Sequence, residues 1–329
     1  MRLRKYLPLA ASLALLPALR PPACGATPRG SASYKGAILM DAASGRVLFE
    51  DNADEVSPPA SMTKLMTYAV LDDRIRSGAL GLQTPITITN ADAKVAMLRD
   101  STCVWLKTGE VFPVEELVYA MMIRSANDAA YALARASAGS VPLFVEWMND
   151  KARQLGMTRT TFRSPNGLPP PSRRVADSDL TTPRDFAILS RYLVLHTGVL
   201  KYTSVKSRQF GVGRRFPPVQ MSNYNHLLGK VAGVDGLKSG VTNAAGFCLT
   251  ATAARNGRRV IAVVMDSPDW RSLDLKIAQL IEHGFAVEPV AVPPVGAQAQ
   301  SAGGAAASAP SSAPPANPAV RFSIPGTPR

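Results

Sequence analysis

The stretch from residue 58 to residue 66, Pro58-Pro59-Ala60-Ser61-Met62-Thr63-Lys64-Leu65-Met66, carries the strongest fold signal in this sequence. Its two prolines stop any preceding helix and keep the entering chain extended. Apolar residues then recur at i, i+3, i+4 and i+7, the spacing of one helix face, at Met62, Leu65, Met66 and Ala69. Gly78 follows as a typical helix end. The pattern predicts a helix that begins near Ser61 and ends near Gly78.

Two polar side chains lie on the same side of this predicted helix. Ser61 is at or near its N-terminus, and Lys64 follows one turn later. An amine that is held neutral can take the proton of a neighbouring hydroxyl and so create a nucleophile. The helix N-terminus also offers N–H groups and partial positive charge to a developing oxyanion. Residues 61–64 also fit an alternative in which the serine caps the helix and the lysine is solvated.

The segments around this helix predict an α+β fold. Residues 35–41 and 46–50 have the pattern of two strands joined by a turn at residues 42–45. Further strands are predicted at residues 85–89, 236–242, 247–253 and 260–265, and helices at residues 113–123, 128–139, 144–155, 182–195 and 271–283. We expect one mostly antiparallel central sheet covered by helices on both faces, with the first and last strands side by side.

The stretches between these elements have weaker patterns. Residues 90–112 are predicted to form loops or short strands, residues 158–175 a loop, and residues 196–234 show no strong period. Thr182 precedes a proline and, three residues later, Asp185, which predicts a capped helix start. Asn127 or Asp128 is expected to cap the helix that follows residue 127.

The two ends of the chain differ in composition from its centre. Residues 1–26 combine basic residues, a short apolar stretch and small residues, which predicts a secretory signal peptide, with a retained anchor as the alternative. Residues 27–34 form a spacer, residues 35–286 one folded domain, and residues 287–329 an Ala- and Pro-rich tail that is expected to be disordered. We therefore expect export across the inner membrane to the periplasm or cell envelope.

The charge and the metal-binding residue types exclude some function classes. The formal net charge is +13, but no aromatic residues interleave the basic ones, so nucleic-acid binding is not expected. Contact with an anionic wall or membrane surface is one interpretation of this charge, and simple solubility is the other. His196, His226 and His283 show no ligand spacing, so no metal or other cofactor is expected. Cys103 and Cys248 are interpreted as small buried residues rather than a disulfide framework.

Two later motifs add chemistry to the serine and lysine. Ser125 and Asn127 lie in a tight turn between two apolar helices, where a hydroxyl could relay a proton, although helix capping is the alternative role. Lys238-Ser239-Gly240 places a cation, a hydroxyl and a glycine on one strand. Lys238 and Gly240 share a face of that strand, and the glycine lets another backbone approach closely. A surface lysine before a turn glycine is the alternative.

Taken in chain order, Ser-x-x-Lys, Ser-x-Asn and Lys-Ser-Gly resemble the motifs of penicillin-binding proteins and serine β-lactamases. Residues 41–48, 59–67 and 234–242 are similar to the D-alanyl-D-alanine carboxypeptidase family in particular, and the resemblance covers roughly residues 33–285. It implies a β-lactamase/transpeptidase-like fold. Ser239 replaces the family's commoner threonine but keeps the hydroxyl. Residues 107–109, Lys-Thr-Gly, also match the Lys-Ser/Thr-Gly motif, but we interpret them as a turn because they precede Ser125.

The resemblance implies a serine D-Ala-D-Ala carboxypeptidase that removes the terminal D-alanine of peptidoglycan stem peptides through an acyl-enzyme. β-Lactam antibiotics would be covalent inhibitors. The implied catalytic residues are Ser61, Lys64 and Ser125, and the implied substrate-binding residues are Asn127, Lys238, Ser239, Gly240, Val241 and Thr242.

Three other functions stay open from the sequence. A DD-endopeptidase of the same family fits the lack of an evident second folded domain or amphipathic anchor after Phe285. A serine β-lactamase would need a deacylating group, and Glu146 with Asn149 lies in a predicted helix, as a surface pair would. A non-catalytic wall-binding protein would not need the full set of hydroxyls and lysines.

Overall fold

The computed structural model describes residues 34–287 of the chain. The predicted signal peptide, the spacer up to residue 33 and the tail from residue 288 lie outside the described residues. Within residues 34–287, no helix combines the length and the apolar character needed to span a bilayer.

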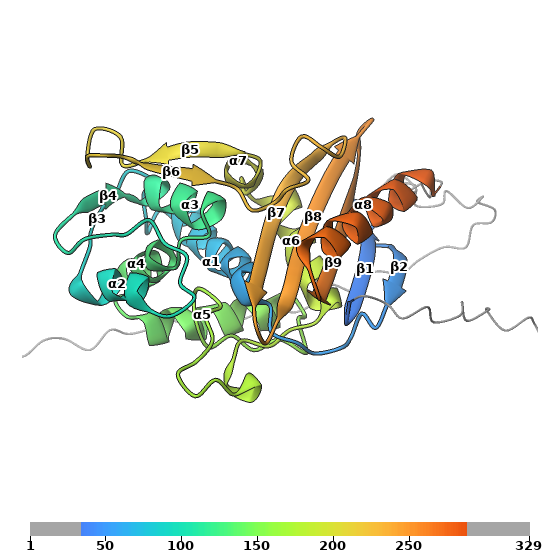
Figure 1. Cartoon of the computed structure of the whole chain (residues 1–329), viewed down its shortest axis with the longest axis horizontal. Coiled ribbons are helices and arrows are strands. Elements are labelled where there is room, and N and C mark those ends of the chain that lie inside the picture. Colours follow the sequence, from blue (N-terminus) through green and yellow to red (C-terminus); the bar gives the residue numbers. More distant parts are fainter. Residues whose placement is uncertain (1–33, 288–329) are drawn as a thin grey trace, which may run out of the picture. The chain divides into compact units, whose positions relative to one another are not determined.

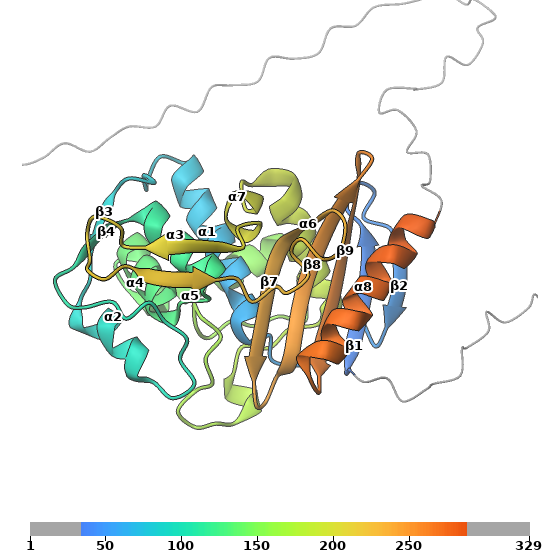
Figure 2. The ribbon, with the colours of Figure 1, turned by 45° about the horizontal axis from the view of Figure 1, so that its top comes forward.

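One five-stranded antiparallel sheet organises the described domain. Its strands, in the order β2-β1-β9-β8-β7, are Val47–Asp51, Gly36–Asp41, Arg258–Ser267, Gly246–Arg255 and Val234–Thr242. β1 pairs with β9 along its whole length, so the first and last strands lie side by side as predicted (Figure 1). Every residue of β1 is buried, and all but Asp41 are apolar, as expected of a strand covered on both faces. β7 is left as an edge strand (Figure 2).

Helices cover both faces of this sheet, which confirms the predicted α+β architecture. α8 (Trp270–Ala286) crosses one face and packs on β8, β9 and β1 (Figures 1 and 2). Asp269 caps this helix by accepting the N–H groups of Arg271 and Ser272. α6 (Pro183–His196) packs on the opposite face, and Thr182 Oγ1 accepts the N–H of Asp185 at its start, as predicted. Two separate apolar clusters result, one on each side of the sheet.

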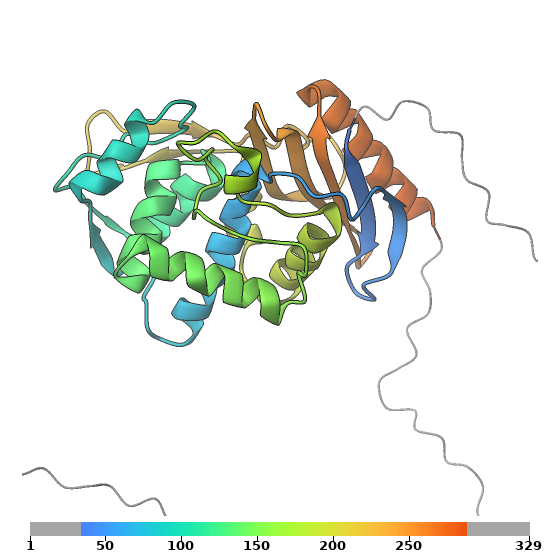
Figure 3. The same cartoon turned by 90° about the horizontal axis from the view of Figure 1, so that it is seen from below.

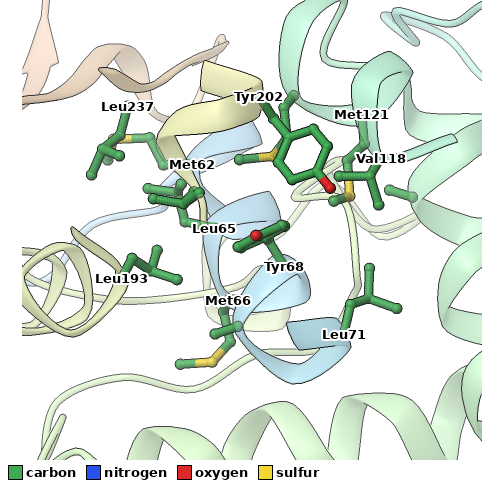
Figure 4. Close-up of a cluster of buried hydrophobic side chains, with 14 of the residues drawn as sticks. Met62, Leu65, Met66, Tyr68, Leu71, Val118, Met121, Leu193, Tyr202 and Leu237 are labelled. Carbon is green, nitrogen blue, oxygen red and sulfur yellow. The ribbon is translucent and has the colours of Figure 1, made fainter. Parts of the chain in front are cut away.

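The larger cluster surrounds α1 (Lys64–Arg76) and the short 3-10 turn η1 (Ala60–Thr63) before it. Met62, Leu65, Met66 and Tyr68 contribute to this cluster, and so does Leu71, further along α1 (Figure 4). The helices around α1 are α3 (Val114–Ile123), α4 (Asn127–Ala138), α5 (Val141–Gln154) and α6. From below, α5 runs past α1 (Figure 3). α1 is therefore buried nearly all round rather than along one stripe.

Ser61 lies in the 3-10 turn η1, which leads directly into α1 at Lys64, so its predicted place near the helix N-terminus is confirmed. Two other local predictions were wrong. The N-cap of α4 is Ala126 and not Asn127 or Asp128. The Asn127 amide oxygen instead accepts a hydrogen bond from Lys64 Nζ, and the Asp128 carboxylate accepts the N–H groups of Val104 and Leu106. α5 begins at Val141, earlier than predicted.

The stretches with weak patterns contain short elements. A short strand within residues 90–112 was predicted, whereas the short helices and the later hairpin were not. Residues 90–112 hold α2 (Asn90–Lys94), which begins with a Thr89–Asp92 capping box, then η2 (Val95–Met97) and the start of β4 (Val111–Pro113), which pairs with β3 (Pro85–Thr87). Residues 196–234 hold α7 (Leu200–Thr203) and a hairpin of β5 (Ser207–Phe210) and β6 (Val219–Ser222). Elements this short lack the length over which periodicity becomes visible.

We predict that Leu71→Ala lowers the free energy of unfolding by about 2–5 kcal/mol, because Leu71 is fully buried in the cluster around α1. Leu275→Ala is the matched control, since Leu275 is 61% exposed and such surface changes alter stability by about 0.5 kcal/mol or less. Urea denaturation followed by circular dichroism measures both. Equal loss in the two variants would contradict this assignment of the core.

Candidate active site

Ser61 and Lys64 are brought together by the junction of η1 and α1. Ala60 adopts φ = +48°, a left-handed conformation that is unusual for a residue with a side chain, and it turns the chain into η1. Lys64 is the first residue of α1. Its Nζ lies 2.8 Å from Ser61 Oγ, so amine and hydroxyl are in direct hydrogen-bond contact, as proton transfer between them requires.

The Lys64 amine is entirely removed from solvent. Besides Ser61, Nζ contacts Asn127 Oδ1 at 2.7 Å and the backbone carbonyl of Asn166 at 2.6 Å. Burial, and after it the like charge of Lys238, lowers the pKa of Lys64 well below its usual value. A neutral amine that contacts a hydroxyl can act as a general base.

Lys238 is a second buried amine beside the first. It lies on β7, is 3% exposed, and its Nζ donates to the carbonyl of Ser239 at 2.9 Å. Burial lowers the pKa of Lys238 to about 7. Two positive charges that are buried close together disfavour each other, so the two amines need not both be protonated. One lysine can then be neutral and act as a base while the other stays charged.

Glycines let the backbones converge around Ser61. A Cβ atom at Gly240 on β7 would lie 2.7 Å from both Pro59 O and Ser61 N, and one at Gly167 would lie 1.9 Å from Ala60 O. Real Cβ atoms do not approach other atoms so closely. The edge strand, the 3-10 turn and the loop at residue 167 can therefore meet only because these positions lack side chains.

Ser125 has the properties of a functional rather than a capping residue. It lies between α3 and α4 with φ = +58°. Its Oγ is buried and finds no hydrogen-bond partner among the described residues. Strained backbone and an unpartnered buried hydroxyl both raise the energy of the folded state, and both cluster at functional sites.

A cleft of about 200 Å³ opens over these groups. The predicted site residues that line it are Ser61, Ser125, Asn127, Ser239, Gly240, Val241 and Thr242. Lys64 and Lys238 are buried and are not part of the lining, but they contact or neighbour residues that are. The structure thus brings all the sequence-predicted site residues to one place.

Several residues around the cleft were not found by sequence reasoning. Gly167 and Leu168 line it from the loop that also holds the Asn166 carbonyl, and Tyr224, His226 and Trp270 form an aromatic wall. The pair Asn166-Gly167 is a recognisable turn signal, but nothing in the sequence connects it to Lys64. His226 and Trp270 pack edge to face with ring centroids 5.0 Å apart.

The remaining sequence candidates lie away from this cleft. Lys107 is exposed next to a turn before β4, as predicted for the Lys-Thr-Gly at residues 107–109. Glu146 is exposed on α5 and lines a different surface hollow. Among residues 34–287, no group of three His, Cys, Asp or Glu side chains could hold a metal ion. Cys103 and Cys248 are buried and free.

Comparison with known proteins identifies the family. The model of the Peptidase_S11 family, D-alanyl-D-alanine carboxypeptidase, matches residues 25–269. The D-alanyl-D-alanine carboxypeptidase DacC of Escherichia coli is 36% identical over 252 residues, which cover 75% of this chain and 60% of that protein. This chain spans about three fifths of the length of curated relatives such as DacC and DacA of E. coli.

Solved structures of penicillin-binding proteins also resemble this chain. Penicillin-binding protein 5 from Haemophilus influenzae aligns with a TM-score of 0.71 and 32% identity, covering 80% of this chain and 73% of that chain. Penicillin-binding protein D2 from Listeria monocytogenes, in its ampicillin-bound form, aligns with a TM-score of 0.67 and 32% identity over 79% of this chain and all of that one. These likenesses confirm the predicted transpeptidase-like fold. The chain belongs to the D-alanyl-D-alanine carboxypeptidase family of low-molecular-weight penicillin-binding proteins.

Proposed function

We propose that this chain is a serine D-Ala-D-Ala carboxypeptidase that trims the terminal D-alanine from peptidoglycan stem peptides. The observation that carries the proposal is the contact of 2.8 Å between the Ser61 hydroxyl and the buried amine of Lys64, at the floor of a cleft bounded by an edge strand. The family membership supports the same substrate class.

In the acylation step, Ser61 Oγ attacks the carbonyl carbon of the penultimate D-alanine while its proton passes to Lys64 Nζ. The peptide C–N bond then breaks. Ser125 Oγ relays a proton from the Lys64 ammonium to the departing D-alanine amine, which restores the neutral lysine. Water hydrolyses the ester on Ser61 and releases the shortened peptide. No oxidant, reductant or cofactor is required.

The strand β7 would hold the substrate. Ser239 and Thr242 are proposed to bind its terminal carboxylate, with Lys238 supplying positive charge behind them. Asn127 orients Lys64 through its Oδ1. The backbone N–H groups of Ser61 and Val241 are proposed to form the oxyanion hole, where one such donor typically contributes about 10²–10³-fold in rate.

The same site is proposed to bind β-lactams as covalent inhibitors, since the Listeria relative was solved with ampicillin. We further propose export to the periplasm or cell envelope and a functional domain of residues 35–286. A rapid β-lactamase is disfavoured, because no glutamate of the described chain lines the cleft and Glu146 lies elsewhere.

We predict that Ser61→Ala abolishes both release of D-alanine from a disaccharide pentapeptide and covalent labelling by fluorescent penicillin. Mass spectrometry of the products and gel fluorescence measure the two outcomes. Ser204→Ala, at an exposed hydroxyl, is the control and should retain both. Retained activity in Ser61→Ala would overturn the proposal, and cleavage of cross-linked dimers in preference to pentapeptide would favour the endopeptidase.

We predict a bell-shaped pH dependence for the second-order rate constant of penicillin acylation. The base must be neutral, so the rate falls as decreasing pH protonates Lys64, whose pKa is lowered by burial and by Lys238. The cation must be charged, so the rate also falls as pH rises past the Lys238 pKa of about 7. Lys238→Arg, which stays charged, should remove the alkaline limb. A flat wild-type profile would contradict both roles.

We predict that Gly240→Ala lowers the rate of acylation by roughly a hundredfold, since a misplacement of about 1 Å at a reacting group has this effect. The new Cβ would collide with Pro59 O and Ser61 N and push the edge strand from the nucleophile. Gly198→Ala is the control, because a Cβ there would meet only Tyr68 Oη, at an ordinary 3.8 Å. Equal acylation rates in the two variants would show that the close approach is not needed.

A further inference from the structure

The buried carboxylate of Asp179, which was not among the predicted site residues, joins two segments next to Lys64. These are the turn η1 and the loop at residues 163–167. Asp179 lies between η3 (Val175–Asp177) and α6 and is 4% exposed. Its Oδ2 accepts a hydrogen bond from Thr63 Oγ1 at 2.7 Å, and Thr63 is the last residue of η1. Its Oδ1 accepts the backbone N–H groups of Arg163 and Ser164 at 2.7 and 2.9 Å. One side chain thus ties the turn that carries the nucleophile to the loop at residues 163–167.

That loop reaches the Lys64 amine directly. Ser164 Oγ donates to Asp179 Oδ2 at 3.1 Å and accepts the N–H of Gly167 at 2.8 Å. Between these two residues, the Asn166 carbonyl lies 2.6 Å from Lys64 Nζ. The position of this carbonyl therefore depends on the contacts of Asp179 on one side and on the close packing of Gly167 against Ala60 on the other.

Asp179 also acts as a charge near Lys64. Three charged groups influence the pKa of the amine: Lys238 from β7, Asp128 from the start of α4, and Asp179 from the loop before α6. Lys238 and burial lower the pKa of Lys64, whereas Asp179 and Asp128 raise it. Burial raises the pKa of Asp179 itself, and the hydrogen bonds from Thr63 and the loop oppose this by stabilising the carboxylate.

We infer that Asp179 is a positioning residue, which fixes the nucleophile turn against the loop that holds Lys64 and sets an opposite charge beside that amine. The inference rests on the proposed function, in which Lys64 is the base. A general base is most effective when its pKa lies near the working pH. Burial and Lys238 lower the pKa of Lys64, and Asp179, together with Asp128, opposes this shift.

Two nearly isosteric variants separate the charge from the tether. Asp179→Asn removes the charge but keeps an oxygen that can accept the loop N–H groups. Thr63→Val removes the hydrogen bond between η1 and Asp179 and keeps the charge. Asp185→Asn is the control, because Asp185 is a buried carboxylate that accepts hydrogen bonds from the Arg159 N–H and the Thr160 hydroxyl instead.

The titration of Lys64 is followed by NMR of protein labelled with ¹³C at the lysine ε carbon, and acylation by fluorescent penicillin is followed over the same pH range. In Asp179→Asn, we expect the Lys64 titration and the acid limb of acylation to move to lower pH, with a roughly ten- to hundredfold lower maximal rate. In Thr63→Val, we expect about a tenfold loss of rate with a much smaller change in the Lys64 titration. Asp185→Asn should leave the titration unchanged.

A Lys64 titration that does not move in Asp179→Asn would overturn the charge role. A folded Thr63→Val protein with the wild-type acylation rate would overturn the tether. If Asp179→Asn does not fold, Thr63→Val still decides the tether. The NMR titration needs no acylation, so a wild-type protein that penicillin does not label would count against the proposed function and leave the role of Asp179 separately decidable.

Discussion

The burial of one lysine amine is the constraint on which the rest of the described domain depends. A charged ammonium without solvent is costly, so the folded chain favours the neutral form of Lys64. The amine is still not left unsatisfied, because Ser61 Oγ, Asn127 Oδ1 and the Asn166 carbonyl surround it. Each of these partners comes from a different part of the chain. Burial of the Lys64 amine costs free energy, but it also leaves the amine neutral and therefore able to accept a proton.

The apolar core makes this burial possible. α1 is enclosed by helices and by the sheet, so its first residue lies at the boundary between a dry interior and the cleft. Protein interiors are densely packed, and Lys64 within this one is 0% exposed. The same core holds η1 in place, and with it the Ser61 hydroxyl. Stability and chemistry therefore depend on the same helix.

The site also concentrates features that are unfavourable elsewhere. Ala60 and Ser125 hold left-handed backbone conformations, the Ser125 hydroxyl lacks a partner in the described chain, and Lys238 is a second buried amine. Locally inconsistent residues of this kind are expected at functional sites and are compensated by the surrounding structure. The edge strand β7 of the five-stranded sheet lines the cleft beside these residues.

Periodicity and turn signals along the chain predicted the antiparallel sheet with helices on both faces and the adjacency of the first and last strands. The family was predicted from the resemblance of three motifs and their flanks to a known family. The sequence patterns did not predict α2 or the β5–β6 hairpin, which are too short to show a period. The contacts of Lys64 with Asn166 and of Thr63 with Asp179 were decided by the tertiary structure alone. Each joins residues about a hundred positions apart, and no local pattern records which distant carbonyl or carboxylate will face a given side chain once the core has closed.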